Sequence, residues 1–407
     1  MDREHLYIIL VGLPARGKST IAGKFCQSLR LDGIRTRIFN NGDLRRKLTK
    51  ENTSYPEFFD PLNREAAALR ERYAILNLNQ ASAFMKKSKA KRKVAIIDAT
   101  NVSQKRRRML SKSLPEGSVL FIECINNDQE ILEANIRYKV SSFEFNHMPV
   151  EEAIDGFKKR VEYYEGIYNP LLEERNFIQV DSFNYRILKA EVNDDIPFID
   201  RIRDLIVTPF IKNLYLIRHT ETSYNLEDRI GGDPELTHNG HSQAIKLVES
   251  FKGKRIPLIF TSGLKRSIQT CIPFKEAQPE CSIIPLSEFN EINGGVCENM
   301  TYQEIREKMP EVAAARKRNK YYYEYPEGEG YVSMEQRIER GIKKVLYLSK
   351  HSDNIMIVGH RAVNRMILSY FVYKRTEDVP YIYMPQDKYY HIMINQNKKV
   401  FELRKFL

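Results

Sequence analysis

The chain has 407 residues, a formal net charge of +12 and an apolar content of 42%. At roughly 150 residues per domain, this length predicts two or three domains, and the apolar content is typical of a globular protein. No apolar run approaches the ~20 residues of a membrane-spanning helix, and the first strand begins so close to Met1 that we expect no signal peptide. The five cysteines have no metal-ligand spacing, so we expect reduced thiols in a cytoplasmic protein. The positive charge is compatible with nucleic acid or with small anions as partners.

A buried strand, a glycine-rich loop and a helix open the chain. Residues 6–11 are continuously apolar, as in a strand buried on both faces. The next eight letters, GLPARGKS at 12–19, fit the phosphate-binding pattern GxxxxGK[ST]. Residues 20–29 then have helical apolar spacing. This context predicts a nucleotide site in which Lys18 reaches the β- and γ-phosphates and Ser19 binds Mg²⁺.

Strands and helices then alternate. We expect further strands at 34–39, 94–98, 119–124 and 177–180, and helices at 63–87, 129–138 and 150–168. Such alternation predicts a parallel sheet with helices on both faces. Asp98 ends one of these strands, where P-loop folds place a magnesium-linked aspartate. The basic run at 86–93, just before a strand, is interpreted as a solvated loop.

A second pattern begins after a turn-rich stretch at 193–209. We place the boundary at 208–212 and expect domains at 1–210 and 211–407. Strands are predicted at 214–217, 257–261 and 354–358, with helical stretches between them. The predicted fold class is α/β, with two domains that each contain a mainly parallel sheet flanked by helices.

Four separated pieces of the second half have residues suited to phosphoryl chemistry. They are Arg218-His219-Thr220-Glu221 with Asn225, the stretch 261–270, Glu291, and Val358-Gly359-His360-Arg361. Both histidine pieces follow apolar strands, so they should meet at the carboxyl edge of a parallel sheet. Two arginines and two imidazoles there would stabilise a phosphoryl group. A neutral imidazole can attack phosphorus, and a nearby acid can protonate the leaving oxygen.

These motifs resemble those of known enzymes. Arg-His-x-Glu, the S-x-L-x-R-x-x-Q-T piece and the late Gly-His are similar to the histidine phosphatase, or phosphoglycerate mutase-like, superfamily. A P-loop half followed by such a half resembles the bifunctional 6-phosphofructo-2-kinase/fructose-2,6-bisphosphatase family. The resemblance implies a P-loop NTPase-like domain that transfers the γ-phosphoryl of MgATP to the 2-hydroxyl of fructose 6-phosphate. It also implies a second domain that hydrolyses fructose 2,6-bisphosphate through a phosphohistidine, and together these activities would control glycolysis and gluconeogenesis.

By position, the resemblance implies roles for residues of the kinase half. It makes Lys18 and Asp98 catalytic, and Ser19 and Asp98 magnesium ligands. The implied nucleotide contacts are Gly12, Ala15, Arg16, Gly17, Lys18, Ser19, Thr20 and Asn135. The implied sugar-phosphate contacts are Arg45, Arg70, Thr100, Arg106, Arg160 and Tyr164.

The resemblance implies a second set of roles in the phosphatase half, which would need no cofactor. His219 matches the nucleophile and Glu291 the acid, with Arg218 and His360 as further catalytic residues. The implied substrate contacts are Asn225, Arg229, Gly231, Arg266, Tyr302, Arg316, Lys320, Tyr331 and Arg365. The tyrosine-rich run at 321–325 is interpreted as mainly structural.

The sequence departs from the family pattern at a few positions. Thr220 replaces a glycine and should restrict the turn, and Asn126 replaces a cysteine. Val140 stands where the family has a lysine, with Lys139 one place earlier, and one residue turns a helical side chain by ~100°.

Three hypotheses therefore stay open. In the first, the chain is a bifunctional enzyme. In the second, the kinase half only binds nucleotide, so that the chain is a bisphosphatase or a sensor. In the third, the chain is a kinase and phosphatase that processes polynucleotide ends. The last lacks a recognisable nucleic-acid module. We expect fructose 6-phosphate and fructose 2,6-bisphosphate as small-molecule partners, with no nucleic acid and no membrane, and a homodimer as a further hypothesis.

Overall fold

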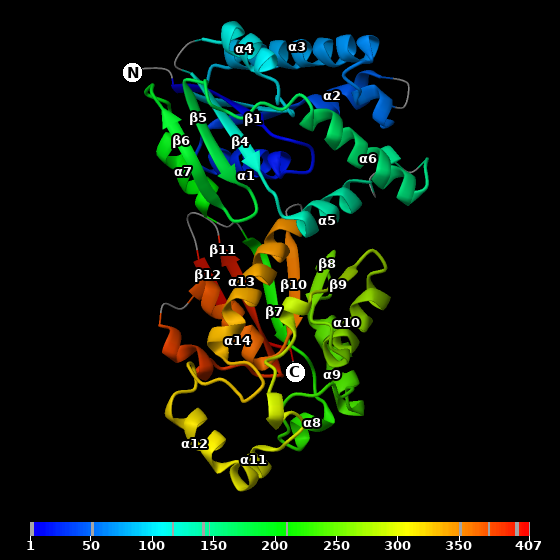
Figure 1. Cartoon of the computed structure of the whole chain (residues 1–407), viewed down its shortest axis with the longest axis vertical. Coiled ribbons are helices and arrows are strands. Elements are labelled where there is room, and N and C mark those ends of the chain that lie inside the picture. Colours follow the sequence, from blue (N-terminus) through cyan, green and yellow to red (C-terminus); the bar gives the residue numbers. More distant parts are fainter. Residues whose placement is uncertain are drawn as a thin grey trace. The chain divides into compact units, whose positions relative to one another are not determined.

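Two mixed sheets organise the chain, one in each of two compact units formed by residues 1–209 and 210–407. The computed structural model describes residues 4–49, 53–115, 118–140, 143–145, 147–208, 211–349, 352–372, 375–394 and 399–406. Within these residues each sheet has six strands, and helices lie on both of its faces (Figure 1). The predicted fold class, two α/β domains with mainly parallel sheets, is therefore confirmed.

The first sheet is built around β1 (Glu4–Val11), which lies between β3 (Arg92–Asp98) and β4 (Val119–Ile125) and runs parallel to both. Its order is β2-β3-β1-β4-β5-β6. The remaining strands are β2 (Arg35–Asn40), β5 (Asn176–Asp181) and β6 (Arg186–Val192). Only β6 is antiparallel to its neighbour among the described strands of this sheet. The sequence prediction missed β6.

Alternate side chains of β1 pack on opposite faces of the sheet. Leu6, Ile8 and Leu10 pack against α1 (Lys18–Leu31) and α7 (Ile199–Val207). Tyr7, Ile9 and Val11 pack against α3 (Arg64–Lys87) and α4 (Gln104–Ser113). Burial of each large aliphatic side chain stabilises the fold by roughly 1.5–3 kcal/mol. The run of apolar residues at 6–11 is continuous because helices cover both faces of β1.

In the second sheet, the central strand β7 (Ile211–Arg218) lies between β10 (Asn354–Gly359) and β11 (Lys388–Ile394). Its order is β12-β11-β7-β10-β8-β9. The outer strands are β8 (Leu258–Thr261), β9 (Ser282–Pro285) and β12 (Lys399–Lys405). β7 to β10 are parallel, whereas β11 is antiparallel to both of its neighbours.

Helices cover both faces of the second sheet (Figure 1). α9 (His238–Ser250) and α10 (Lys265–Ala277) bury Leu247, Phe251 and Phe274 against β7 and β10. α13 (Tyr331–Leu348) and α14 (Arg361–Val372) pack together on the other face. The shorter helices are α8 (Ser223–Leu226), α11 (Tyr302–Lys308) and α12 (Pro310–Arg318).

Most predicted elements of the first unit have the expected type, but some bounds differ. The remaining helices are α2 (Asn41–Leu48), α5 (Gln129–Val140) and α6 (Val150–Glu165). α6 ends three residues before the predicted 168, because Gly166 caps it and an Asn169-Pro170 pair follows.

The basic run at 86–93 is not simply a solvated loop. Lys86 and Lys87 end α3, and Lys93 is buried in β3. The Lys93 ammonium group donates hydrogen bonds to the carbonyl oxygens of Met85 and Ser88. The buried charge is therefore satisfied by the end of the preceding helix.

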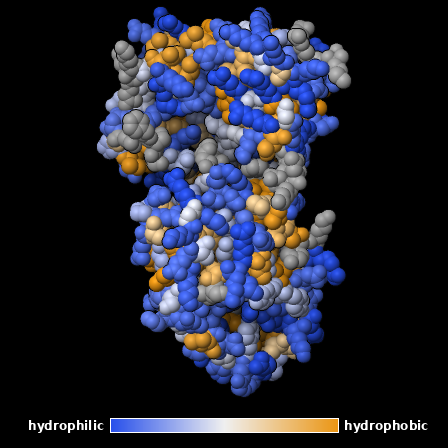
Figure 2. Space-filling model, turned by 180° about the vertical axis from the view of Figure 1, so that it is seen from behind, coloured by the Kyte–Doolittle hydropathy of each residue, from blue (hydrophilic) through white to orange (hydrophobic). Residues whose placement is uncertain are grey.

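The visible face of the molecule in Figure 2 is mostly hydrophilic, with hydrophobic residues in separate groups. No helix among the described residues is both long and apolar enough to cross a lipid bilayer. The five cysteines are all buried and unpaired.

Candidate active sites

The glycine-rich loop connects β1 to α1. Gly12 has a φ of +137°, and a Cβ there would lie 2.5 Å from the carbonyl oxygen of Cys124, so no side chain fits. Gly17 caps α1 with a φ of +85°. The backbone N–H of Gly12 donates to the carbonyl oxygen of Thr100 at 2.9 Å, which brings the residues after β3 to the loop. A helix that begins in such a loop offers backbone N–H groups to an anion.

Lys18 and Asp98 lie at the same edge of the first sheet, because β1 and β3 are parallel neighbours. The Lys18 ammonium group donates to the Leu13 carbonyl oxygen at 2.6 Å. Burial lowers the pKa of Lys18 to about 8, and the charge of Asp98 opposes that shift. Asp98 accepts a hydrogen bond from the Asn40 amide at 2.6 Å. The Asp98 carboxylate and the Ser19 hydroxyl are oxygen donors of the kind that Mg²⁺ prefers, so the donor set fits this ion.

Lys139 and Val140 have different surroundings. Val140 is buried in an apolar cluster with Ile136 and Phe157. Burial lowers the pKa of Lys139, and the nearby charge of Asp98 opposes that shift. The one-residue displacement in sequence therefore still leaves an ammonium group whose charge interacts with that of Asp98.

The other predicted nucleotide contacts surround the loop. The Asn135 amide donates to the Ala15 carbonyl oxygen at 3.2 Å. The buried Arg16 guanidinium donates to the carbonyl oxygen of Asn126. The Thr20 hydroxyl is buried and has no partner among the described residues. These contacts hold the loop against β4 and α5.

Three of the predicted sugar-phosphate residues surround Phe59. The guanidinium carbons of Arg45 and Arg160 lie 5.2 Å and 3.8 Å from the centre of its ring. The ring of Tyr164 lies 6.2 Å from it. Burial lowers the pKa of Arg160 to about 10, with Tyr164 opposing and Arg45 adding to the shift. Arg45 also forms a buried ion pair with Glu144. Buried guanidiniums that are crowded in this way favour an anionic ligand.

Arg70 and Arg106 adjoin this cluster. Arg70 donates to the carbonyl oxygen of Phe58 and lies 5.9 Å from its ring centre. Arg106 pairs with Glu71 on α3, and its charge acts on the pKa of Arg70. The structure thus brings these predicted residues to one region, whereas Thr100 lies at the glycine loop.

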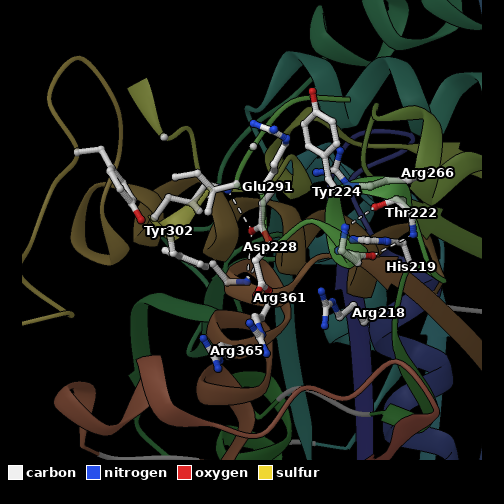
Figure 3. A pocket seen from close by; sticks show the side chains of 18 of the residues that line it. Arg218, His219, Thr222, Tyr224, Asp228, Arg266, Glu291, Tyr302, Arg361 and Arg365 are labelled. Atoms are coloured by element: carbon white, nitrogen blue, oxygen red, sulfur yellow. Dashed lines mark hydrogen bonds between the residues drawn. The ribbon is translucent and has the colours of Figure 1, made fainter. Parts of the chain in front are cut away.

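The second unit contains a cavity of about 310 Å³ at the carboxyl end of β7 and β10, a size suited to a small molecule. It is lined by Arg218, His219, Asn225, Arg229, Gly231, Arg266, Glu291, Tyr302, Arg316, Lys320, Tyr331 and Arg365. Figure 3 shows His219, Arg218 and Arg266 grouped at one end and Tyr302 at the other. His360 is fully buried and is not among the lining residues.

His219 is positioned by its strand and by its neighbour. Its backbone N–H donates to the Gly359 carbonyl oxygen at 2.9 Å, which continues the pairing of β7 with β10. The ring Nδ1 lies 2.8 Å from the Thr220 carbonyl oxygen, which can only accept, so Nδ1 carries the proton and Nε2 keeps its lone pair. Burial, Arg218 and Arg266 hold the pKa of His219 well below 6.5. The imidazole is therefore neutral and suited to nucleophilic attack.

The ring of His360 lies close to that of His219, with 5.2 Å between the two ring centres. Its Nε2 lies 2.7 Å from the hydroxyl of Ser262 and 3.1 Å from that of Ser267. Burial, Arg266 and the neighbouring His219 lower the pKa of His360. A neutral His360 ring therefore adds no positive charge next to His219.

Glu291 is fixed at the beginning of α14. The Oε1 atom of its carboxyl group accepts hydrogen bonds from the backbone N–H groups of Ile292 at 3.0 Å, Ala362 at 3.2 Å and Val363 at 3.4 Å. The carboxyl group also lines the cavity. These bonds fix the carboxyl group at the wall of the cavity.

Arg218 and Arg266 supply positive charge beside His219. Burial and the neighbouring Arg361 lower the pKa of Arg218 to about 10, while Glu291 opposes that shift. Arg266 donates to the Gly232 carbonyl oxygen at 2.8 Å, which fixes its position. Two guanidiniums so placed can bind the oxygens of a phosphoryl group.

The opposite end of the cavity is also cationic. The guanidinium of Arg316 lies 5.1 Å from the ring centre of Tyr302. Arg365 donates to the Tyr331 hydroxyl at 3.2 Å. Burial, with Arg316 and Arg365, lowers the pKa of Lys320 to about 8. A second anionic group on the ligand would relieve this repulsion.

Arg229 and Gly231 form the rim of the cavity. Arg229 is paired with Glu304 at 3.1 Å. Gly231 has a φ of +67°, and a Cβ there would overlap Glu298.

Thr220 replaces glycine without strain. It is fully buried, and it is not among the described residues with a positive φ. Its backbone N–H donates to the Thr270 hydroxyl at 3.2 Å, and the two hydroxyls lie 3.3 Å apart. The added bulk is therefore accommodated by a polar partner on α10.

Residues 1–202 match the 6-phosphofructo-2-kinase family, and residues 214–406 match the histidine phosphatase superfamily (branch 1). The chain is 36% identical over 394 residues to 6-phosphofructo-2-kinase/fructose-2,6-bisphosphatase 3 of Rattus norvegicus and of Homo sapiens. These matches cover 93% of this chain and 68% and 72% of those proteins. The enzyme named 6-phosphofructo-2-kinase/fructose-2,6-bisphosphatase from Aquarana catesbeiana is 35% identical over 392 residues, with 93% and 80% covered.

The chain belongs to this bifunctional kinase/bisphosphatase family. The resemblance predicted from its motifs is therefore confirmed over nearly the whole sequence. Both halves of the family are present in one chain, in the expected order.

Some residues of the phosphatase-like cavity were not predicted. Gln386, Tyr323 and Tyr325 line it, and so does Arg361, which belongs to one of the four predicted pieces but was given no role of its own. The signal for Arg361 was its place directly after His360 at the end of a strand. Nothing in the local sequence marks Gln386, which lies in a loop before β11.

Proposed function

We propose that the chain makes fructose 2,6-bisphosphate from ATP and fructose 6-phosphate in its first half and hydrolyses it in its second half. The observation that carries the proposal is a neutral, oriented His219 between two arginines, in the same chain as a P-loop with Lys18 and Asp98. The names of the family relatives give the substrates.

In the kinase half, the residues bind and orient two phosphate compounds. The glycine loop and Lys18 would cradle the phosphates of ATP, and the arginines near Phe59 would bind the sugar phosphate. Ser19 and Asp98 would hold Mg²⁺, which would neutralise charge on the ATP phosphates. Lys139 supplies a further positive charge beside Asp98, where charge moves during phosphoryl transfer.

In the phosphatase half, His219 Nε2 would attack the 2-phosphoryl phosphorus, forming the N–P bond as the P–O bond to the sugar breaks. Glu291 would give its proton to the departing oxygen of fructose 6-phosphate. A water would then attack the phosphohistidine, with the Glu291 carboxylate accepting its proton, and release phosphate. Arg218 and Arg266 would stabilise the charge on the phosphoryl oxygens in both steps.

The cations at the far end of the cavity favour a bisphosphate over a monophosphate. Arg316, Lys320 and Arg365 would bind the 6-phosphate while the 2-phosphoryl lies at His219. For the kinase half, Lys139 beside Asp98 favours turnover over mere nucleotide binding. The cytoplasmic location and the homodimer remain predictions of the sequence.

The proposal is tested by assaying both activities in purified wild type, Lys18→Met and His219→Ala. We expect the wild type to have both activities. Lys18→Met should lose kinase turnover by at least ~100-fold because it removes a charge at the transferred phosphoryl group, and should keep the bisphosphatase. His219→Ala should do the reverse. Loss of both activities in either variant, or neither activity in the wild type, would contradict the proposal.

A further inference from the structure

Gln386 links two parts of the phosphatase-like cavity that are far apart in sequence. It lies between η5 (Thr376–Tyr381) and β11, and it lines the cavity. Its Nε2 lies 2.8 Å from Asn225 Oδ1 and 3.2 Å from the His219 carbonyl oxygen. One side-chain amide therefore contacts both the residue that bears the nucleophile and a second residue of the cavity wall.

The orientation of both amides follows from fixed backbone groups. Asn225 Oδ1 accepts from the backbone N–H of Thr222 at 3.1 Å, so the oxygen of this amide must be on that side. The His219 carbonyl can only accept, so Gln386 must present its NH₂ group there. The two hydrogens of Gln386 Nε2 thus have two definite acceptors.

Asn225 Oδ1 is consequently held by two donors, Thr222 and Gln386. Its Nδ2 has no partner among the described residues, and Asn225 lines the cavity. The amide is thereby fixed with its donor group available to a ligand. If the amide turned over, Asn225 would present an oxygen to an anionic ligand, which is repulsive.

We propose that Gln386 is a positioning residue of the phosphatase site, which fixes the Asn225 amide so that its NH₂ group, and not its oxygen, meets the phosphoryl group. The second hydrogen bond of Gln386, to the His219 carbonyl oxygen, holds the Gln386 amide in the orientation that this requires. This inference rests on the proposed bisphosphatase function. It predicts that Gln386 acts through Asn225 and not by direct contact with the sugar.

The test is a double-mutant cycle on bisphosphatase activity in the full chain. Gln386→Met has a similar size but no donor, and it should lower kcat/KM for fructose 2,6-bisphosphate about ten-fold. It should also raise the inhibition constant of inorganic phosphate. Asn225→Ala should lower kcat/KM by a similar or larger factor. In the Asn225→Ala background, Gln386→Met should have an additional effect of less than about two-fold.

Gln278→Met is a matched control in the same unit. Gln278 also joins two backbone groups, accepting from Ile256 N–H at 2.8 Å and donating to the Lys254 carbonyl oxygen at 3.0 Å, and it does not line the cavity. Gln278→Met should lower the melting temperature without changing kcat/KM for fructose 2,6-bisphosphate. Because Asn225→Ala removes a capping bond of α8, Asn225→Asp, which keeps the oxygen acceptors, provides a second cycle.

Full additivity of the two substitutions in both cycles would overturn the inference and point to direct contact. Equal kcat/KM in Gln386→Met and Gln278→Met would overturn it as well. In both cases an active wild type would leave the proposed function standing. A folded wild type that does not hydrolyse fructose 2,6-bisphosphate would overturn the proposed function and this inference with it.

Discussion

The charge states of individual buried side chains decide what each site can do. His219 has to be neutral to attack phosphorus, and burial with two adjacent guanidiniums keeps its pKa below the ordinary 6.5. In the other unit, Lys18 is buried and Lys139 is partly buried, but Asp98 opposes the lowering of their pKa values. Burial therefore favours a neutral, nucleophilic imidazole in the second unit. In the first unit, the charge of Asp98 counteracts burial and favours the charged form of the lysines, which suits phosphate binding.

Lys139→Met should lower kinase turnover at least ~10-fold, because it removes a charge beside Asp98 while keeping the length of the side chain. Arg137→Met on the same helix is the control, since the Arg137 side chain is 64% exposed and such surface ion pairs contribute little. We expect the control to match the wild type. Steady-state kinase assays with both variants check this, and equal rates for Lys139→Met and wild type would remove Lys139 from the site.

Pairs of loops, joined by single side chains, form the rim of the phosphatase-like cavity. The Glu298 carboxylate accepts hydrogen bonds from the backbone N–H groups of Gly232 and Gly294, both at 2.5 Å. Gly232 in turn accepts from Arg266 through its carbonyl oxygen. A chain of contacts therefore runs from η4 (Gly295–Cys297) and its flanking residues to the guanidinium beside His219.

Gly231→Ala should disrupt this rim. A Cβ at Gly231 would lie 1.8 Å from a carboxylate oxygen of Glu298, so the loop or Glu298 must move. We expect bisphosphatase kcat/KM to fall at least ~10-fold, because misplacement of a charged donor removes transition-state stabilisation. Kinase turnover should not change.

Gly253→Ala is the matched control for that substitution. Gly253 has a similar φ of +79°, but a Cβ there meets nothing within 4 Å. It isolates the backbone strain of ~1–2 kcal/mol that a left-handed alanine carries. Comparable losses of kcat/KM in both variants would show that strain, and not the contact with Glu298, is responsible.

The sequence predicts an element well where its apolar pattern is strong. β1, β3, β4, β7 and β10 were found because they are covered on both faces. β6 has exposed Arg186 and Lys189 at a sheet edge, and therefore lacks an apolar run. His219 and His360 belong to this class, because each directly follows a strand with a strong apolar pattern. Gln386 does not, since only the folded chain brings its loop to His219.

In the whole molecule, the two candidate sites are built from residues of different units. The P-loop site uses residues of unit 1–209, and the phosphatase-like cavity uses residues of unit 210–407. No described residue named in one site belongs to the other unit. Substitutions in one site should therefore leave the other reaction intact.

The central claim is that His219 carries the phosphoryl group. Brief incubation of the full chain with fructose 2,6-bisphosphate labelled at the 2-phosphate, followed by alkaline quenching and proteolysis, tests it most directly. We predict base-stable, acid-labile label on His219, no label in His219→Ala, and slower labelling in Glu291→Gln because the leaving oxygen lacks its proton donor. An active wild type that carries its label on His360, or on no residue, would contradict the account.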